Sequence, residues 1–299
     1  MSVMTAFALG LVAQGAEPDA LSLPIGTPGA VQALPNEIVA TRSGKAVTLD
    51  DLAAAADGTR WVYVGESHDN ADHHKMQAAV IDALIKRGRN VVVGFEMFTR
   101  PVQQNLNGWT LGWYTDEEFV AKSDWKTQWG FDYALYKPIF DTIKANRLPM
   151  VALNVPRDWV RTASRQGYDA LPADAKSQLP EMFLGNKDHR SIFEAMVGGH
   201  AGGAVDGMYR GQVMWDEGMA DSALKYMDEY PRSPKTVMVV VAGSGHVMYE
   251  QGINWRIERR TKENGVTLVM IDGTESRKVS KGLADFVYMA PPAKSNGGS

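Results

Sequence analysis

Five short apolar runs stand out along the chain, and each is followed by a polar or glycine-rich segment. They comprise residues 61–64, 90–94, 149–153, 236–242 and 266–271. Because the runs are rich in β-branched residues and lack polar alternation, we expect strands that are buried on both faces. Helical patterns lie between them. The sequence therefore predicts an α/β fold, with a mainly parallel β-sheet flanked by helices.

Two helical regions can be predicted between these strands. Residues 72–86 place four apolar side chains on one face, and Gly88 ends this helix. Residues 158–232 have no convincing strand pattern but contain several helical stretches rich in Met, Ala and Gln. We therefore expect a helical insertion subdomain between the third and fourth strands. Four tryptophans within residues 109–129 are expected to cap the core rather than to line a ligand slot.

The predicted strands and helices form a single domain, at about residues 37–290, between two segments of different composition. Residues 1–36 are expected to be a leader and linker, with an apolar run at 4–13 and a Pro-rich stretch after it. The apolar run is typical of the core of a secretory signal peptide, although no Lys or Arg precedes it. It therefore favours export. Residues 291–299 are expected to form a disordered tail.

Composition narrows the classes of function. The chain is 44% hydrophobic and 22% charged, which is ordinary for a globular protein. Its net charge of -4 argues against nucleic acid as a partner, because phosphate binding requires a basic surface. No apolar run approaches the ~20 residues of a transmembrane helix, so we expect no transmembrane segment. The absence of cysteine excludes a disulfide, a thiolate metal site and a cysteine nucleophile.

Polar clusters follow four of the predicted strands directly. In an open parallel sheet the carboxyl ends of the strands share one edge, and ligands bind there. We expect seven polar residues to meet at this edge: Glu66, His68, Glu96, Arg100, Asn154, Arg157 and His246. Two of the clusters share the spacing Gly-x-x-His, in which glycine allows a sharp turn at the strand exit.

This set of residues permits two kinds of enzyme chemistry. Two histidines and two glutamates could hold a divalent metal such as Mn, Co or Zn that activates water, namely His68, His246, Glu66 and Glu96. Alternatively, His68 could act as a general base oriented by Glu66 or Glu96, with Arg100 stabilising an oxyanion. The chain has no G-x-S-x-G serine elbow and no H-E-x-x-H zinc helix.

Two further predictions concern charged and titratable neighbours of this edge. Arg157 is expected to form an ion pair with Glu66 or Glu96, because buried carboxylates need such partners. His73 and His74 are adjacent in the predicted helix, so their side chains point about 100° apart. We expect one of them to face the site and the other to face solvent.

Five motifs occur in a fixed order along the chain. They are GESHDN at 65–70 with His73 and His74, FEMF at 95–98 with Arg100 and Gln103, NVPR at 154–157, WDEGMA at 215–220 and AGSGHV at 242–247. In this order they resemble the motifs of the ChaN-like haem-binding proteins of the Tiki superfamily, which are kin to erythromycin esterases and TraB-type proteins. The likeness extends over roughly residues 37–273.

The resemblance implies a periplasmic bacterial protein of haem or iron uptake, with haem as its partner and pairing into a homodimer through the haem surface. Members are often lipoproteins, but this chain has no lipobox cysteine. A porphyrin needs an apolar slot, cations for its propionates and an axial ligand. The resemblance favours a tyrosine ligand, for which we select Tyr209, with His200 as the competing ligand.

Three other residues of the helical insertion are candidates for the haem slot: Met208, Met214 and Arg210. Methionine and aromatic residues at helical spacing are equally typical of an ordinary core. The sequence therefore leaves a second function open, in which a metal-dependent or histidine-based hydrolase of the peptidase or esterase kind uses Glu66, His68, Glu96 and His246, with Arg100 and Arg157.

Overall fold

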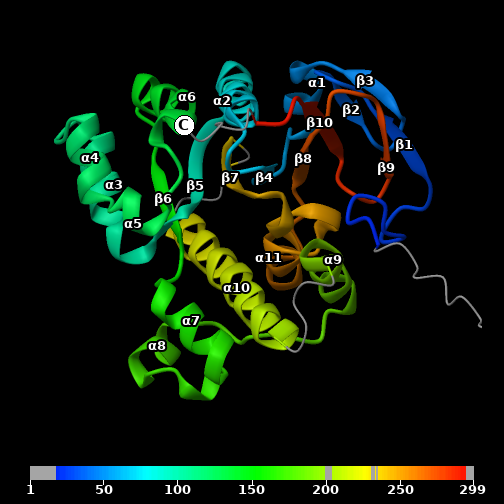
Figure 1. Ribbon diagram of the computed structural model, residues 1–299. Coiled ribbons are helices and arrows are strands. Elements are labelled where there is room, and N and C mark those ends of the chain that lie inside the picture. The colour runs from blue at the N-terminus through cyan, green and yellow to red at the C-terminus, as the bar shows by residue number, and fades with distance from the viewer. Residues whose placement is uncertain (1–17, 199–203, 230–232, 234, 294–299) are drawn as a thin grey trace, which may run out of the picture.

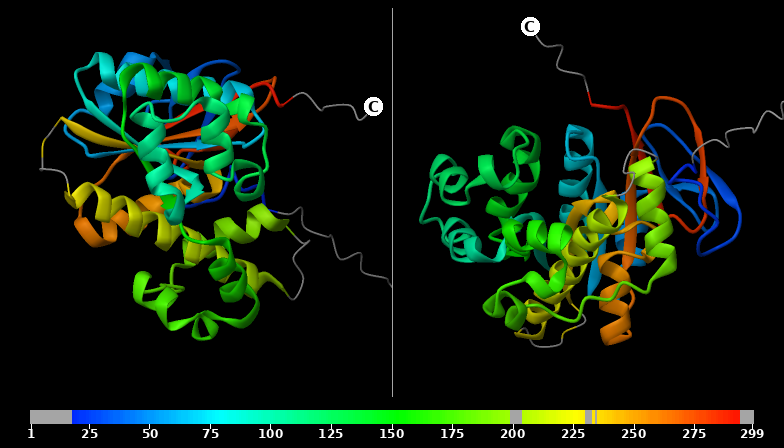
Figure 2. Two further views of the ribbon diagram at one scale, coloured as in Figure 1. Left: turned by 90° about the vertical axis from the view of Figure 1, so that its left-hand side faces the viewer. Right: turned by 60° about the horizontal axis from the view of Figure 1, so that its bottom comes forward.

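The computed structural model describes residues 18–198, 204–229, 233 and 235–293. In this part of the chain an eight-stranded sheet lies between two layers of helices (Figures 1 and 2). Its strands are β2 (Ile38–Ala40), β3 (Lys45–Val47), β4 (Trp61–Glu66), β5 (Asn90–Thr99), β6 (Met150–Asn154), β7 (Thr236–Gly243), β8 (Val266–Asp272) and β10 (Phe286–Ala290). A separate antiparallel pair joins β1 (Ala30–Ala33) to β9 (Arg277–Ser280).

The strand order of the large sheet is β3-β2-β10-β8-β4-β7-β5-β6. The six strands from β10 to β6 are parallel, whereas β2 pairs antiparallel both with β10 and with the edge strand β3. All five strands predicted from apolar runs lie within the parallel part. The prediction of an α/β fold with a mainly parallel sheet is therefore confirmed.

Alternate residues of each central strand contribute to two separate apolar cores. In β4, Val62 and Val64 belong to one core, whereas Trp61 and Tyr63 belong to the other. Successive side chains of a strand point to opposite faces of the sheet, so a strand with a core on each face must be apolar throughout. This burial explains why the central strands have no polar alternation.

Helices cover both faces of the sheet, as the left view of Figure 2 shows. The first core lies under α1 (Leu49–Ala55), α2 (Ala71–Lys86), α3 (Gln103–Thr110), α4 (Asp116–Lys122), α5 (Trp125–Gln128) and α6 (Tyr133–Asn146). The second core lies under α10 (Val205–Glu229) and α11 (Ile253–Thr261), with α9 (Lys187–Val197) at its border. A smaller core joins α7 (Arg157–Gln166) and α8 (Ala173–Gln178) to α10.

The segment between β6 and β7 is helical, as expected for the insertion. Helices α7 to α10 lie in it, and its described residues form no strand. A second helical stretch at 103–146, which the sequence analysis did not identify, lies between β5 and β6. Trp109 and Trp125 in this stretch are buried in the first core, as the core-capping interpretation expects, whereas Trp113 is exposed.

The two ends of the chain are described only in part. Residues 18–36, within the expected leader and linker, contain β1, and Leu23 and Ile25 are buried there. Residues 1–17, with the apolar run at 4–13, and residues 294–299 of the expected tail lie outside the described residues. Within the described ranges, no helix has both the length and the apolarity needed to cross a bilayer.

Candidate functional site

Glu66 is the last residue of β4, and its carboxylate is fully buried. Oε1 lies 2.9 Å from His68 Nδ1 and accepts a hydrogen bond from the Tyr136 hydroxyl at 2.8 Å. Oε2 lies 3.1 Å from His74 Nδ1 and accepts a hydrogen bond from Gln77 Nε2 at 2.7 Å. Burial alone would raise the pKa of Glu66, but the hydrogen bonds from the two histidines hold it well below its usual range.

His68 is the accessible member of this group. Its side chain is 30% exposed, and its ring contacts Trp129 edge to face with the centroids 4.6 Å apart. A Cβ atom on Gly243 would lie 2.8 Å from His68 Cε1, so only glycine leaves room for the imidazole at the end of β7. Burial lowers the pKa of His68, but the Glu66 hydrogen bond and the Glu96 charge outweigh it and raise that pKa.

Glu96 lies in a bulge at the end of β5. The pairing of β5 with β6 shifts register between Phe95 and Thr99, and a bulge of this kind redirects side chains at a sheet edge. Glu96 Oε2 accepts a hydrogen bond from the Gly243 backbone N–H at 2.7 Å, and Asn154 Nδ2 donates to the Glu96 carbonyl at 3.0 Å. The bulge therefore turns the carboxylate of Glu96 towards the end of β7.

His246 follows β7 in the short helical turn η4 (Ser244–His246) and lies between two carboxylates. Nε2 lies 3.3 Å from Glu96 Oε1, and Nδ1 lies 2.5 Å from Asp216 Oδ1. Although burial opposes ionisation, the charges of Glu96 and Asp216 raise the pKa of His246 to about 10. The imidazole is therefore cationic at neutral pH and donates through both nitrogens, a role that differs from that of a neutral metal ligand.

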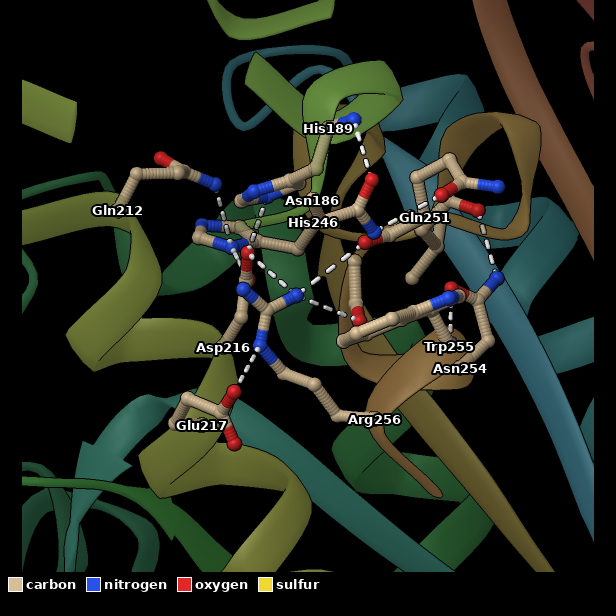
Figure 3. Close-up of polar contacts among 12 residues, drawn as sticks. Asn186, His189, Gln212, Asp216, Glu217, His246, Gln251, Asn254, Trp255 and Arg256 are labelled. Carbon is tan, nitrogen blue, oxygen red and sulfur yellow. Dashed lines mark hydrogen bonds and ion pairs between the residues drawn. The ribbon is translucent and has the colours of Figure 1, made fainter. Parts of the chain in front are cut away.

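Asp216 of α10 extends this cluster into the helical layer (Figure 3). Its Oδ2 lies 2.8 Å from His189 Nε2, and Arg256 Nη1 lies 3.6 Å from the same oxygen. His189 Nδ1 in turn lies 3.1 Å from the Tyr209 hydroxyl. A buried chain of hydrogen-bonding side chains thus runs from His246 through Asp216 and His189 to Tyr209.

The structure brings together five of the seven polar residues expected at the sheet edge: Glu66, His68, Glu96, Asn154 and His246. Arg100 lies elsewhere: its guanidinium donates to the Ser222 hydroxyl, the Gly218 and Gln178 carbonyls and Asp221. These bonds tie the end of β5 to α10 and to the end of α8, so Arg100 has no nitrogen directed at an oxyanion beside His68.

Arg157 and the adjacent histidines also differ from expectation. Arg157 donates to the Thr127 carbonyl at 3.0 Å instead of pairing with Glu66 or Glu96, although it borders a 40 Å³ cavity together with Glu96. His73 and His74 are both buried, so the prediction that one faces solvent is wrong. The reason is local, because the β4–α2 loop covers the first turn of α2 and its Ser67 N–H donates to His73 Nδ1.

The haem candidates of the insertion lie in different environments. Tyr209 is 3% exposed, and burial raises its pKa to about 12. Met208 is exposed, whereas Met214 is fully buried in the small core of α7, α8 and α10. Arg210 donates to the Ala163 and Ser164 carbonyls. The fifth candidate, His200, lies outside the described residues.

A cavity of about 550 Å³ opens beside Tyr209 at the first turns of α9 and α10. Its lining includes Lys187, Arg190 and Arg210, together with Leu184 and the acidic Asp206, which is paired with Arg190. Sequence reasoning did not identify this cavity, because it depends on how two helices separated by undescribed residues pack against each other. It also missed Asp216 and His189, although Asp216 stands in the WDEGMA motif.

The four residues expected to bind a metal occur as two separate hydrogen-bonded pairs. Glu66 is bonded to His68, and Glu96 is paired with His246. Across the described part of the chain, no group of three or more His, Asp or Glu side chains is arranged to hold a metal ion. The structure instead places the partly exposed imidazole of His68 beside the buried, ionised carboxylate of Glu66.

Comparison with known proteins identifies the family. A family model described as haem-binding uptake, Tiki superfamily, ChaN matches residues 52–257, well over half of the chain. The chain belongs to this ChaN family. The family resemblance drawn from the five motifs is therefore confirmed. No curated protein matches the chain.

Two solved structures show how widely the fold of this ChaN-family chain is shared. One, described as cofacial haem binding to ChaN of Campylobacter jejuni, is 17% identical, with a TM-score of 0.66 over 84% of this chain and 95% of that one. The other, a mutant erythromycin esterase EreC in its open conformation, is 11% identical, with a TM-score of 0.53 over 89% of this chain and 98% of that one. At these identities the likeness concerns the fold alone.

Proposed function

We propose that this ChaN-family chain binds haem and acts in bacterial haem or iron uptake. The observation that carries the proposal is the 550 Å³ cavity at the start of α9 and α10, in a chain whose family is described by haem-binding uptake. Cavities of roughly 300–1,000 Å³ are usual for small-molecule and cofactor sites. The cavity also borders Tyr209, the residue selected from the sequence as the iron ligand.

The residues around this cavity fit a porphyrin. Leu184 lines it and is 44% exposed, and Met208, 43% exposed, is the neighbour of Tyr209. Lys187, Arg190 and Arg210 would supply cations for the propionates. Arg190 would exchange its ion pairs with Glu194 and Asp206 for a propionate, and Arg210 its bonds to two backbone carbonyls. The buried Met214 is not part of the proposed surface. When bound, haem would supply an iron centre that accepts an axial ligand from the protein.

Tyr209 is the proposed axial ligand, and His200 remains its competitor. The Tyr209 hydroxyl is bonded to His189 and donates to the Asn186 carbonyl at 3.3 Å. Tyr209 must exchange both bonds for the iron, so the proposal requires a local rearrangement where α9 meets α10.

Pairing into a homodimer through the haem surface and export to the periplasm are part of the same proposal. Size-exclusion chromatography with and without haem tests the pairing.

The ligand is tested with two tyrosine variants. Tyr209→Phe should change the absorption spectrum of the haem complex, because it removes the proposed ligand atom while keeping the ring. Tyr168→Phe is the matched control, since the Tyr168 hydroxyl donates to the Arg210 carbonyl in the same subdomain. An unchanged spectrum in Tyr209→Phe would reject this ligand and direct the assignment to His200.

A hydrolase is the second candidate, and the exposure of His68 favours it. His68 Nδ1 is held by the buried Glu66 carboxylate, which leaves Nε2 as the atom available for general acid–base catalysis. The cationic His246 beside Glu96 supplies a positive charge at the same edge. A metal-dependent form with Mn, Co or Zn would require Glu66, His68, Glu96 and His246 to release their present partners.

Hydrolysis of ester and peptide substrates is the measurement for this second candidate. Activity should be lost in His68→Asn, by at least the roughly 10²-fold that general-base catalysis contributes. Lys75→Ala, an exposed change on α2, the helix that follows the loop carrying His68, should leave it intact. Elemental analysis of the active protein then separates the metal-dependent form from the metal-free form. The candidate is rejected if the wild-type chain hydrolyses none of the substrates, or if His68→Asn retains the activity.

A further inference from the structure

A second group of oxygen-bearing side chains surrounds the hydroxyl of Tyr63, and none of them belongs to the sites described above. Tyr63 is in the middle of β4 and is 1% exposed, and its hydroxyl has no hydrogen-bond partner among the described residues. A buried, unpartnered hydroxyl costs free energy, so native proteins rarely leave one without water or a ligand. Tyr63 borders a cavity of about 10 Å³.

Polar side chains from several elements line this cavity. Glu250 comes from the turn η5 (Met248–Glu250), Asn254 and Glu258 from α11, and Thr267 from β8. A volume of about 10 Å³ suits an occupant the size of one water molecule or one ion. The lining is therefore anionic and rich in oxygen, and it surrounds a space for a single small particle.

The carboxylates of this cavity lack cationic partners. Within the described ranges no Lys or Arg side chain forms an ion pair with Glu250 or Glu258. The arginines of α11 bind elsewhere: Arg256 and Arg260 are paired with Glu217. Burial and the nearby negative charges of Asp285 and Glu258 accordingly raise the pKa of Glu250 to about 7.

The backbone that presents Glu250 is also unusual. Tyr249 and Glu250 are consecutive non-glycine residues with φ angles of 57° and 56°. A non-glycine residue held in the left-handed region is strained, and such strain persists where surrounding interactions fix it. The strained turn follows His246 closely, and the Tyr249 backbone N–H donates to the Leu283 carbonyl at 2.7 Å.

From these observations we propose that the cavity beside Tyr63 binds a hard divalent cation, with Ca²⁺ as the best match. Ca²⁺ prefers oxygen ligands at roughly 2.3–2.6 Å and accepts irregular shells of carboxylate, amide, hydroxyl and backbone oxygens. Glu250 and Glu258 would supply the charge, and Tyr63 and Thr267 the neutral side-chain oxygens. Asn254 is not counted among the ligands, because its amide oxygen accepts the Trp255 N–H and its amide nitrogen donates to Thr267. The cation would connect η5, α11, β4 and β8, and hold the strained turn behind His246. This site is independent of haem binding.

Isothermal titration of the chelator-treated full-length protein tests the cation site. One equivalent of Ca²⁺ should bind, with Mg²⁺ weaker, in a titration extended to about 10 mM so that weak sites are included. Binding should raise the melting temperature. Glu250→Gln and Glu258→Gln should each weaken it by roughly tenfold or more, since each removes a charged ligand. Glu275→Gln, an exposed glutamate between β8 and β9, is the matched control and should bind as wild type.

Tyr63→Phe provides a second variant, since it removes the hydroxyl and keeps the buried ring. It should weaken Ca²⁺ binding while the protein stays folded. The proposal is overturned if neither Ca²⁺ nor Mg²⁺ binds in the titration, in which case the cavity holds only water. It is equally overturned if the glutamine variants bind Ca²⁺ with wild-type affinity.

Discussion

Asp216 is a buried carboxylate that contacts three basic side chains of the site. Its two carboxylate oxygens serve His246, His189 and Arg256, and the side chain is fully buried. Burial would raise the pKa of Asp216, but the positive charges of His246 and Arg256 hold it well below its usual range. Glu66 at the end of β4 is likewise a buried, ionised carboxylate that is bonded to two histidines. Two ionised carboxylates thus determine the orientation of the imidazoles around them.

Replacing Asp216 tests this interpretation of the buried charges. Asp216→Asn should lower the free energy of unfolding by about 3–5 kcal/mol, because it leaves the charges of Arg256 and His246 buried without their counter-ion. Urea denaturation measures the loss. Asp158→Asn is the matched control: Asp158 pairs with Arg161 at the surface of α7, so its loss should cost about 1 kcal/mol or less. A loss in Asp216→Asn no larger than that in the control would contradict the interpretation.

At the scale of elements, the cationic His246 connects three parts of the fold. It follows β7, faces Glu96 at the end of β5 and faces Asp216 on α10. Arg100 reinforces the same junction through its bonds to α10. The strand ends and the long helix are therefore fixed to one another by ionised groups as well as by apolar packing.

The pH dependence of stability follows from this junction. The pKa of His246 is raised in the folded protein to about 10, so its contribution is fully present below the unfolded value of ~6.5 and is lost as the pH rises towards 10. The free energy of unfolding should therefore fall between pH 7 and pH 10. The fall should be smaller in His246→Gln. If the two proteins lose stability equally over this interval, His246 is not cationic in the folded state.

At the scale of the whole molecule, the central sheet was predictable because burial on both faces leaves an unambiguous apolar run. Strands β2, β3 and β10 were not predicted, since two are only three residues long and the pairing of β10 with β8 links distant parts of the chain. Glu66, His68, Glu96 and His246 followed from the rule for strand ends. Asp216 and His189 did not, because their meeting depends on the rotation and packing of α9 and α10.

At this scale the molecule also contains two separate candidate sites. The Glu66–His68 pair lies at the strand ends, and Tyr209 borders the separate 550 Å³ cavity of the helical layer. His246, Asp216 and His189 form the buried link from Glu96 at the sheet edge to Tyr209. The proposed haem surface and the candidate hydrolytic residues are therefore separate places on one scaffold.

Titration of the purified wild-type chain with haemin tests the central claim most directly. The proposal predicts a saturable change in the Soret region at a fixed ratio of haem to protein, because a defined site holds the porphyrin and its iron. Absence of any Soret shift, with stoichiometric Mn, Co or Zn found instead by elemental analysis, would contradict haem binding and favour the metal-dependent hydrolase.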